Sequence, residues 1–356
     1  MDMKRPITLV LLAALVLAVA AGAYWFTTND SDPSGVGGDG DEVARDLTED
    51  EVLDSAPLVY YVEGDALKSI GARDDEGEIV REGLSPYVTG ADQATYVTWV
   101  EFGSGDQPVI QLYDRAADEK ETISGTAPVW DEAGQRFAYL SPTRLGSCSE
   151  TDCEVPVQVV VFDTGSGESK LWLDQGRWSI VGWAGDELIV GDAKNKSRSS
   201  IVDAEGDTRR LRIAFGDIKS VSPDGEWVIS SKQSGPELVR IADGIDRSPL
   251  GDNDDTVTFV DWASDSSRAA VVATFDEDPP RLFIVDTESR SIEPFNEDEV
   301  VGEVFWGPDD QGVVLTRVDR DELQLQASFC RIEAPDKCVS LLEWQTNIRV
   351  VGVDER

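Results

Sequence analysis

Residues 218–231 read IKSVSPDGEWVISS, two runs rich in β-branched residues on either side of Ser222, Pro223, Asp224 and Gly225. Proline at the second position and glycine at the fourth are typical of a tight turn. The stretch therefore predicts two antiparallel strands joined by that turn. Whether such a pair occurs once or recurs along the chain decides the fold.

The same form recurs, because five other segments also place a short polar turn between two apolar runs: residues 86–100, 127–141, 181–192, 260–274 and 304–317. The residues just before the six turns are Thr89, Trp130, Trp183, Val221, Trp262 and Trp306, spaced 41, 53, 38, 41 and 44 residues apart. A period near 40 with a strand pair at each repeat is typical of a β-propeller blade.

Two further strand-like runs follow the anchor pairs, so each repeat predicts four strands, called A to D in chain order. The ends of the chain complete one more unit: residues 58–84 resemble strands B to D, and residues 346–356 resemble an A strand. Joining them would close the ring and leave no blade incomplete. The sequence predicts an all-β propeller of seven blades, or of six or eight if one weak repeat is misread.

The strand–turn–strand unit resembles the repeat of TolB-type, WD40-like β-propellers of the bacterial cell envelope, with Ser222–Gly225 matching the family turn in full. The resemblance covers residues 57–356. It implies an interaction protein rather than an enzyme, although propellers carry many unrelated functions.

The repeated tryptophans at positions 130, 183, 262 and 306 have two interpretations. Evenly spaced aromatic rings could stack on carbohydrate at a surface. At one position of each blade, they are better suited to fill the space between neighbouring blades.

The N-terminus predicts export. Lys4 and Arg5 precede an apolar run from Ile7 to Phe26, long enough to span a membrane with the N-terminus in the cytoplasm. Residues 1–26 are therefore interpreted as an uncleaved signal anchor and residues 27–56 as an acidic, solvated linker, with 57–356 as the propeller. The alternative is a signal peptide that is cleaved, which gives a secreted protein.

Charge and composition exclude some functions. The chain carries a formal charge of −39, which repels nucleic acid and favours cations, basic ligands and basic proteins. It contains no histidine, which excludes histidine-dependent triads and metal sites. An envelope protein or a basic ligand is the expected partner; the oligomeric state stays open.

The four cysteines form two local pairs, Cys148 with Cys153 and Cys330 with Cys338. Outside the cytoplasm such pairs predict disulfides. The alternative, one zinc site made by all four, has spacings wider than most zinc motifs.

Acidic loops of the last three blades supply the candidate binding site. The strand order places the D–A and B–C loops on one face of the ring and the A–B and C–D turns on the other. The first face then carries an acidic arc of Asp252, Asp254, Asp255, Asp276, Glu277, Asp278, Glu297, Asp298 and Glu299. Crowded carboxylates favour a basic partner or a hard cation such as Ca²⁺, but acids also crowd loops in any chain of this composition.

Two functions follow from these features. The first is a membrane-tethered, extracytoplasmic propeller that acts as a non-enzymatic interaction or sensing module. The second is a secreted propeller enzyme, of hydrolase or lactonase type, that uses carboxylates and a bound divalent cation. No catalytic residue is assigned.

Overall fold

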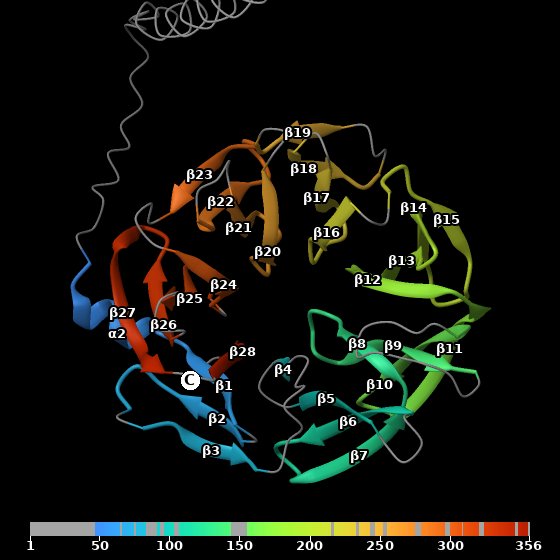
Figure 1. Cartoon of the computed structure of the whole chain (residues 1–356), viewed down its shortest axis with the longest axis horizontal. Coiled ribbons are helices and arrows are strands. Elements are labelled where there is room, and N and C mark those ends of the chain that lie inside the picture. The colour runs from blue at the N-terminus through green and yellow to red at the C-terminus, as the bar shows by residue number, and fades with distance from the viewer. Residues whose placement is uncertain are drawn as a thin grey trace, which may run out of the picture. The chain divides into compact units, whose positions relative to one another are not determined.

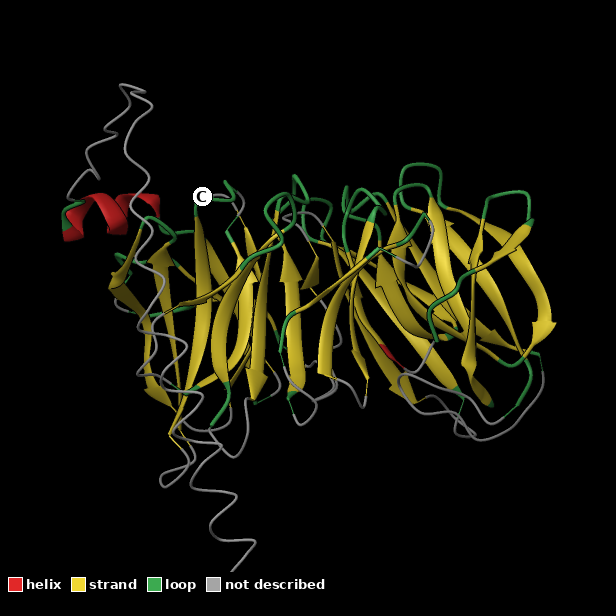
Figure 2. Ribbon diagram, turned by 90° about the horizontal axis from the view of Figure 1, so that it is seen from above, coloured by secondary structure: helices red, strands yellow, loops and turns green. Residues whose placement is uncertain are grey.

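The computed structural model describes residues 47–354, apart from 65, 75, 83–90, 93–95, 103–106, 144–154, 215–216, 233–234, 243–245, 252–254, 275–278, 296–299, 308, 320–323 and 346–347. Within these residues the chain forms seven four-stranded antiparallel sheets arranged around a central axis (Figure 1). Seen from the side, the strands run between two loop-bearing faces (Figure 2). The predicted seven-bladed propeller is confirmed.

The first blade joins the two ends of the described chain, in the order β28 (Ile348–Asp354), β1 (Leu58–Glu63), β2 (Ala66–Ile70) and β3 (Glu78–Arg81). Strand β28 pairs antiparallel with β1, with Leu58 opposite Asp354 and Glu63 opposite Ile348. The ring is therefore closed by the C-terminal strand, as the sequence predicts, and blade 1 has a full set of strands.

The other six blades follow in chain order. Blade 2 holds β4 (Ala91–Asp92), β5 (Tyr96–Phe102), β6 (Pro108–Asp114) and β7 (Glu119–Ser124); blade 3 holds β8 (Thr126–Trp130), β9 (Arg136–Pro142), β10 (Val157–Asp163) and β11 (Glu168–Gly176). Blade 4 holds β12 (Trp178–Ala184), β13 (Glu187–Asp192), β14 (Asn195–Val202) and β15 (Thr208–Arg210). Blade 5 holds β16 (Ile218–Val221), β17 (Trp227–Lys232), β18 (Gly235–Arg240) and β19 (Arg247–Pro249). Blade 6 holds β20 (Thr256–Trp262), β21 (Arg268–Thr274), β22 (Arg281–Asp286) and β23 (Ile292–Phe295); blade 7 holds β24 (Val301–Trp306), β25 (Gly312–Asp319), β26 (Gln324–Arg331) and β27 (Ala334–Gln345).

The hydrophobic core lies between the blades. The described residues contain seven buried apolar clusters, one at each junction of neighbouring blades. In β17, for example, Val228 packs toward blade 4 and Ile229 toward blade 6. Because both faces of an inner strand are covered, these strands are continuous apolar runs in the sequence.

A short helix, α2 (Glu49–Ser55), precedes the first strand and packs on β27 and β26 of blade 7. Thr48 caps it: its hydroxyl accepts from the backbone N–H of Glu51, whose carboxylate accepts from the backbone N–H of Thr48. Val52 is fully buried, and the ammonium of Lys337 donates to the carbonyl of Leu47 at 2.7 Å. This part of the expected linker packs on the propeller instead of being a solvated tether.

No helix among the described residues is long and apolar enough to cross a membrane. The apolar run from Ile7 to Phe26, the expected anchor, lies outside the described residues.

Candidate functional site

Among the described residues, the turns between strands A and B of blades 3 to 7 lie along one rim, and hydrogen bonds or ion pairs join each of these blades to the next. The Ser222–Gly225 turn of blade 5 lies next to the corresponding turns of blades 4 and 6. The backbone N–H of Gly185, in blade 4, donates to the carbonyl of Pro223 at 3.2 Å, and the backbone N–H of Asp224 donates to the hydroxyl of Ser266, in blade 6, at 3.0 Å. The turn is thus held from both sides.

The same rim continues from blade 6 to blade 7 through Asp310. One carboxylate oxygen of Asp310 accepts from the backbone N–H of Ser264 at 2.8 Å, and the other accepts from the Ser264 hydroxyl and from the backbone N–H of Asp265. Asp310 has a positive φ of 54°. Since a carboxylate bound to backbone donors stiffens both turns, the rim is a preorganised surface.

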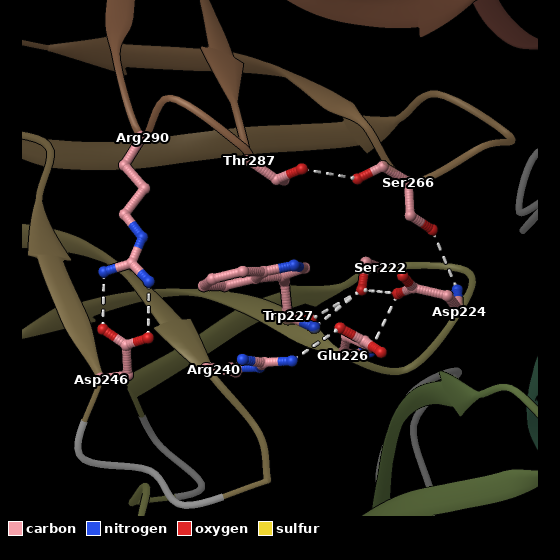
Figure 3. Close-up of polar contacts among 9 residues, drawn as sticks. All are labelled: Ser222, Asp224, Glu226, Trp227, Arg240, Asp246, Ser266, Thr287 and Arg290. Atoms are coloured by element: carbon pink, nitrogen blue, oxygen red, sulfur yellow. Dashed lines mark hydrogen bonds and ion pairs between the residues drawn. The ribbon is translucent and has the colours of Figure 1, made fainter.

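Within its own turn, Asp224 has a structural role (Figure 3). Its carboxylate accepts from the hydroxyl of Ser222 at 2.6 Å and from the backbone N–H of Glu226 at 2.9 Å. Ser222 in turn accepts from the backbone N–H of Trp227 at 2.9 Å. Gly225 closes the turn at φ +71°, where its missing Cβ would lie 2.6 Å from the carbonyl carbon of Ala184 in the neighbouring blade.

The anchor tryptophans lie between blades, and each indole N–H donates to the preceding blade. Trp130 donates to the hydroxyl of Thr98 at 2.9 Å, Trp183 to the carbonyl of Val129 at 2.9 Å, Trp262 to the hydroxyl of Ser220 at 3.1 Å, and Trp306 to the carbonyl of Asp261 at 3.0 Å. Trp183, Trp262 and Trp306 are buried. Their geometry fits packing between blades and not a carbohydrate-stacking surface.

Guanidinium groups cover two of these rings. Arg136 lies 4.8 Å above the ring of Trp183, and Arg268 lies 5.2 Å above the ring of Trp306. Arg136 also pairs with Asp131 at 2.8 Å and with Asp186 of the next blade at 2.9 Å. These contacts make the arginines part of the blade junctions.

Glu132, in the A–B turn of blade 3, has the most perturbed side chain on this rim. Desolvation, together with the negative charges of Asp310, Asp224 and Asp131, raises the pKa of Glu132 to about 7. Asp224 and Asp310 come from blades 5 and 7, so the turns of three blades converge closely enough for their charges to act on one carboxyl. A group with this pKa exchanges its proton near neutral pH.

A second carboxyl with a raised pKa is that of Asp261, near the end of β20. Burial raises the pKa of Asp261 to about 6, against the lowering effect of the backbone N–H groups of Trp306 and Trp262, and the charge of Asp310 raises it further. Asp310 therefore links the two titrating carboxyls electrostatically.

The acidic arc expected on the opposite face is represented by Asp255 alone, which is buried directly before β20. The other eight residues, Asp252, Asp254, Asp276, Glu277, Asp278, Glu297, Asp298 and Glu299, lie outside the described residues, so the arc stays a prediction. In the parts of the chain that the structure covers, no three cysteine, aspartate or glutamate side chains are arranged to hold a metal ion.

The predicted disulfide between Cys330 and Cys338 is present, joining paired positions of β26 and β27 with the Cα atoms 4.3 Å apart. With both sulfurs in this bond, neither is available as a thiolate for the four-cysteine zinc alternative. Cys148 and Cys153 lie outside the described residues.

Comparison with known proteins shows the fold. No protein-family model matches the chain, and no curated protein matches its sequence. Similar solved structures include TolB from Acinetobacter baumannii (15% identity, TM-score 0.49, covering 83% of this chain and 65% of that chain) and the dihydro-heme d1 dehydrogenase NirN (15%, 0.46, 84% and 76%). Hsv2 from Kluyveromyces lactis matches at 11% identity with a TM-score of 0.50, over 83% of this chain and all of that chain.

The chain thus spans less than two thirds of the length of TolB. At these identities the likeness concerns the propeller fold and carries no information on activity. The resemblance to TolB-type and WD40-like propellers therefore concerns the fold, which the seven four-stranded sheets show.

Proposed function

We propose that this protein is a non-enzymatic interaction module that receives a basic partner at the A–B turn rim. One observation carries the proposal: besides desolvation, the negative charges of Asp310, Asp224 and Asp131, which lie in the turns of blades 7, 5 and 3, raise the pKa of Glu132. A lysine or arginine side chain placed there would relieve this repulsion.

The rim is suited to binding because it is already ordered. The hydrogen bonds from Gly185 to Pro223, from Asp224 to Ser266 and from Ser264 to Asp310 fix successive turns to one another. A partner that docks on fixed groups loses less free energy to ordering. Association with the rim therefore requires little rearrangement of the backbone.

The sequence adds an expected cellular location to the proposal. The basic residues Lys4 and Arg5, followed by the apolar run from Ile7 to Phe26, support a membrane tether with the propeller on the extracytoplasmic side. The partner would then be an envelope protein with an exposed basic segment.

Titration with a basic peptide tests this function. Full-length protein in detergent is titrated with an oligolysine peptide and with a neutral peptide of equal length, at pH 8 and two salt concentrations. Glu132→Gln removes one charge from the A–B turn rim, and Glu288→Gln removes one from an exposed C–D turn of the same face. We expect salt-sensitive binding of oligolysine that Glu132→Gln weakens severalfold and Glu288→Gln leaves unchanged; equal weakening would mean that net charge alone attracts the peptide.

A second function, a carboxylate-based hydrolase or lactonase, is favoured by the raised pKa values of Glu132 and Asp261. A carboxyl that titrates near the working pH can act as a general acid or base. Hydrolysis of ester and lactone substrates by the wild type, with and without added Ca²⁺, tests it. Activity that Glu132→Gln abolishes would replace the interaction function, whereas no turnover of any substrate would remove the enzyme alternative.

A further inference from the structure

A basic pocket lies at the outer edge of the ring between blades 4 and 5. Its volume is about 250 Å³, and it is lined by Arg209, Arg210, Leu211, Arg212, Ile241 and Ala242. The first four residues belong to β15 and its continuation; β15 is the outermost strand of blade 4 (Figure 1). Three of the six lining residues are arginines in a chain whose formal charge is −39.

The apolar members of the pocket are fixed. Leu211 and Ile241 are buried and belong to the cluster that joins blades 4 and 5. The backbone N–H of Leu211 donates to the carbonyl of Ser199 at 3.0 Å, and the N–H of Ile241 donates to the carbonyl of Glu226 at 2.8 Å. The backbone that carries the arginine side chains is therefore held in place.

The three arginines differ in their ion pairs to described residues. Arg209 pairs with Glu187 at 2.8 Å. Arg210 and Arg212 are exposed, and no carboxylate of the described residues pairs with either one. Two arginines without a carboxylate partner among the described residues are unexpected where acids outnumber bases 70 to 31.

Two acids of blade 5, Glu237 and Asp246, are already paired with basic side chains. Glu237 accepts from Lys232 and from Arg247, both at 2.7 Å, and Asp246 forms a two-bond pair with Arg290 at 2.6 Å (Figure 3). Arg247 also extends a guanidinium N–H to the backbone carbonyl of Arg212, 3.5 Å away. A further positive group therefore borders the pocket.

The strand edge adds a backbone donor. In β15, Arg210 lies opposite Ser200, and the neighbouring Leu211 bonds to Ser199. Because hydrogen bonds alternate along an antiparallel pair, the backbone N–H of Arg210 points away from β14, toward the open edge of the blade. An oxyanion at this edge can accept from both backbone and guanidinium groups.

We propose that this pocket binds the phosphate group of a small ligand. Guanidinium groups match the geometry of phosphate oxygens and stay charged at all relevant pH values. A volume of about 250 Å³ lies below the usual range of pockets for drug-sized ligands, which favours a small oxyanion. Charges further than about 8 Å away are largely screened at physiological salt, so a small anion responds to the arginines while a long polyanion meets the acidic surface.

Phosphate binding tests the proposal directly. Full-length protein is titrated with inorganic phosphate, at ionic strength held constant with NaCl, by isothermal calorimetry. The variant Arg210→Gln/Arg212→Gln is compared with Lys170→Gln/Arg177→Gln, which removes two exposed bases from blade 3 and its connection to blade 4. We expect saturable binding in the wild type and control, weakened about tenfold or more in the pocket variant, because bonds to charged groups contribute substantially to affinity.

A second measurement locates the bound ion. Phenylglyoxal modifies accessible arginines, and mass spectrometry identifies which ones; phosphate should protect Arg210 and Arg212 but not Arg177. Parallel titrations with sulfate and acetate report whether a tetrahedral oxyanion is preferred. Absence of saturable phosphate binding, equal weakening in both double variants, or protection that spares Arg210 and Arg212 would overturn the proposal. Circular dichroism confirms that each variant is folded.

Discussion

Asp261 and Trp306 join blade 6 to blade 7 through two hydrogen bonds that run side by side. The backbone N–H of Trp306 donates to the carboxylate of Asp261 at 2.7 Å, and the indole N–H of Trp306 donates to the carbonyl of Asp261 at 3.0 Å. The first bond favours the ionised carboxylate, yet burial raises the pKa of Asp261 to about 6. The junction therefore contains a carboxyl that loses its proton at a stability cost.

Replacing Asp261 by Asn should make the protein more stable at neutral pH. Because the folded-state pKa is above the unfolded value, the folded state binds more protons between about pH 4 and 6, and wild-type stability falls as pH rises through that window. Asn retains an acceptor for Trp306 and has no charge. The free energy of unfolding of Asp261→Asn, minus that of the wild type, should be about 1–2 kcal/mol larger at pH 8 than at pH 4. Urea unfolding of both proteins at both pH values measures this difference.

The Ala variant separates charge from hydrogen bonding. Asp261→Ala also removes the charge but leaves the Trp306 N–H without its carboxylate acceptor, which costs about 1–3 kcal/mol when the donor is buried. It should be less stable than Asp261→Asn at every pH. Equal stability of the two variants would mean that the bond to Trp306 contributes nothing.

The tryptophan bonds between blades should show measurable coupling. The indole of Trp262 donates to the hydroxyl of Ser220, so Trp262→Phe and Ser220→Ala each remove one partner. A double-mutant cycle by chemical denaturation should give a coupling of about 0.5–1.5 kcal/mol, the usual contribution of one hydrogen bond. Strict additivity of the two single effects would contradict the role given to the anchor tryptophans.

Gly225 should tolerate alanine much less well than another glycine in the same conformation. Gly225→Ala brings a Cβ to 2.6 Å from the Ala184 backbone, whereas a Cβ at Gly64, φ +65°, meets nothing within 4 Å. Both variants incur the cost of positive φ, about 1 kcal/mol, but only Gly225→Ala adds a clash between blades. Thermal unfolding should therefore show a larger loss for Gly225→Ala, and similar losses would mean that the turns of blades 4 and 5 move apart freely.

The sequence contained enough information for the architecture because the propeller repeats a local unit. The turn at Ser222–Gly225 and the tryptophans at a period near 40 specify strand pairs, and the terminal fragments specify ring closure. The contact of α2 with blade 7 was not predicted, because the sequence around Leu47 and Val52 shows no continuous apolar face. Their burial depends on a surface that exists only after blade 7 has formed.

The candidate site was harder to predict for the same physical reason. Glu132 lies 92 residues before Asp224, which lies 86 residues before Asp310. Their turns come together only because the ring closes. Their shared position in A–B turns was a usable signal in the sequence. The most crowded acids, however, lie in loops of the last three blades, which the strand order places on the opposite face. The arginine pocket was detectable in residues 208–212, which read TRRLR. The acidic composition of the whole chain gave no indication of this basic run.

Reducing the bond between Cys330 and Cys338 should destabilise the protein modestly. The loop it closes spans a sequence separation of 8, for which chain entropy gives about 2.5 kcal/mol. We expect dithiothreitol to lower the midpoint of urea unfolding of the wild type. The variant Cys330→Ala/Cys338→Ala, which already lacks this bond, should respond less to the reductant; an equal response would assign the effect to other cysteines.

Helix α2 should contribute to propeller stability, which would place the start of the folded domain before residue 57. Val52 is fully buried against blades 7 and 1, and Val52→Ala removes two methyl groups from that cluster at a cost of about 1–2 kcal/mol. Asp50→Ala, an exposed change in the same helix, should alter stability by only about 0.5 kcal/mol. Urea unfolding of the full-length variants measures both. If Val52→Ala and Asp50→Ala behave alike, α2 adds nothing to the closed ring, and the domain begins at β1.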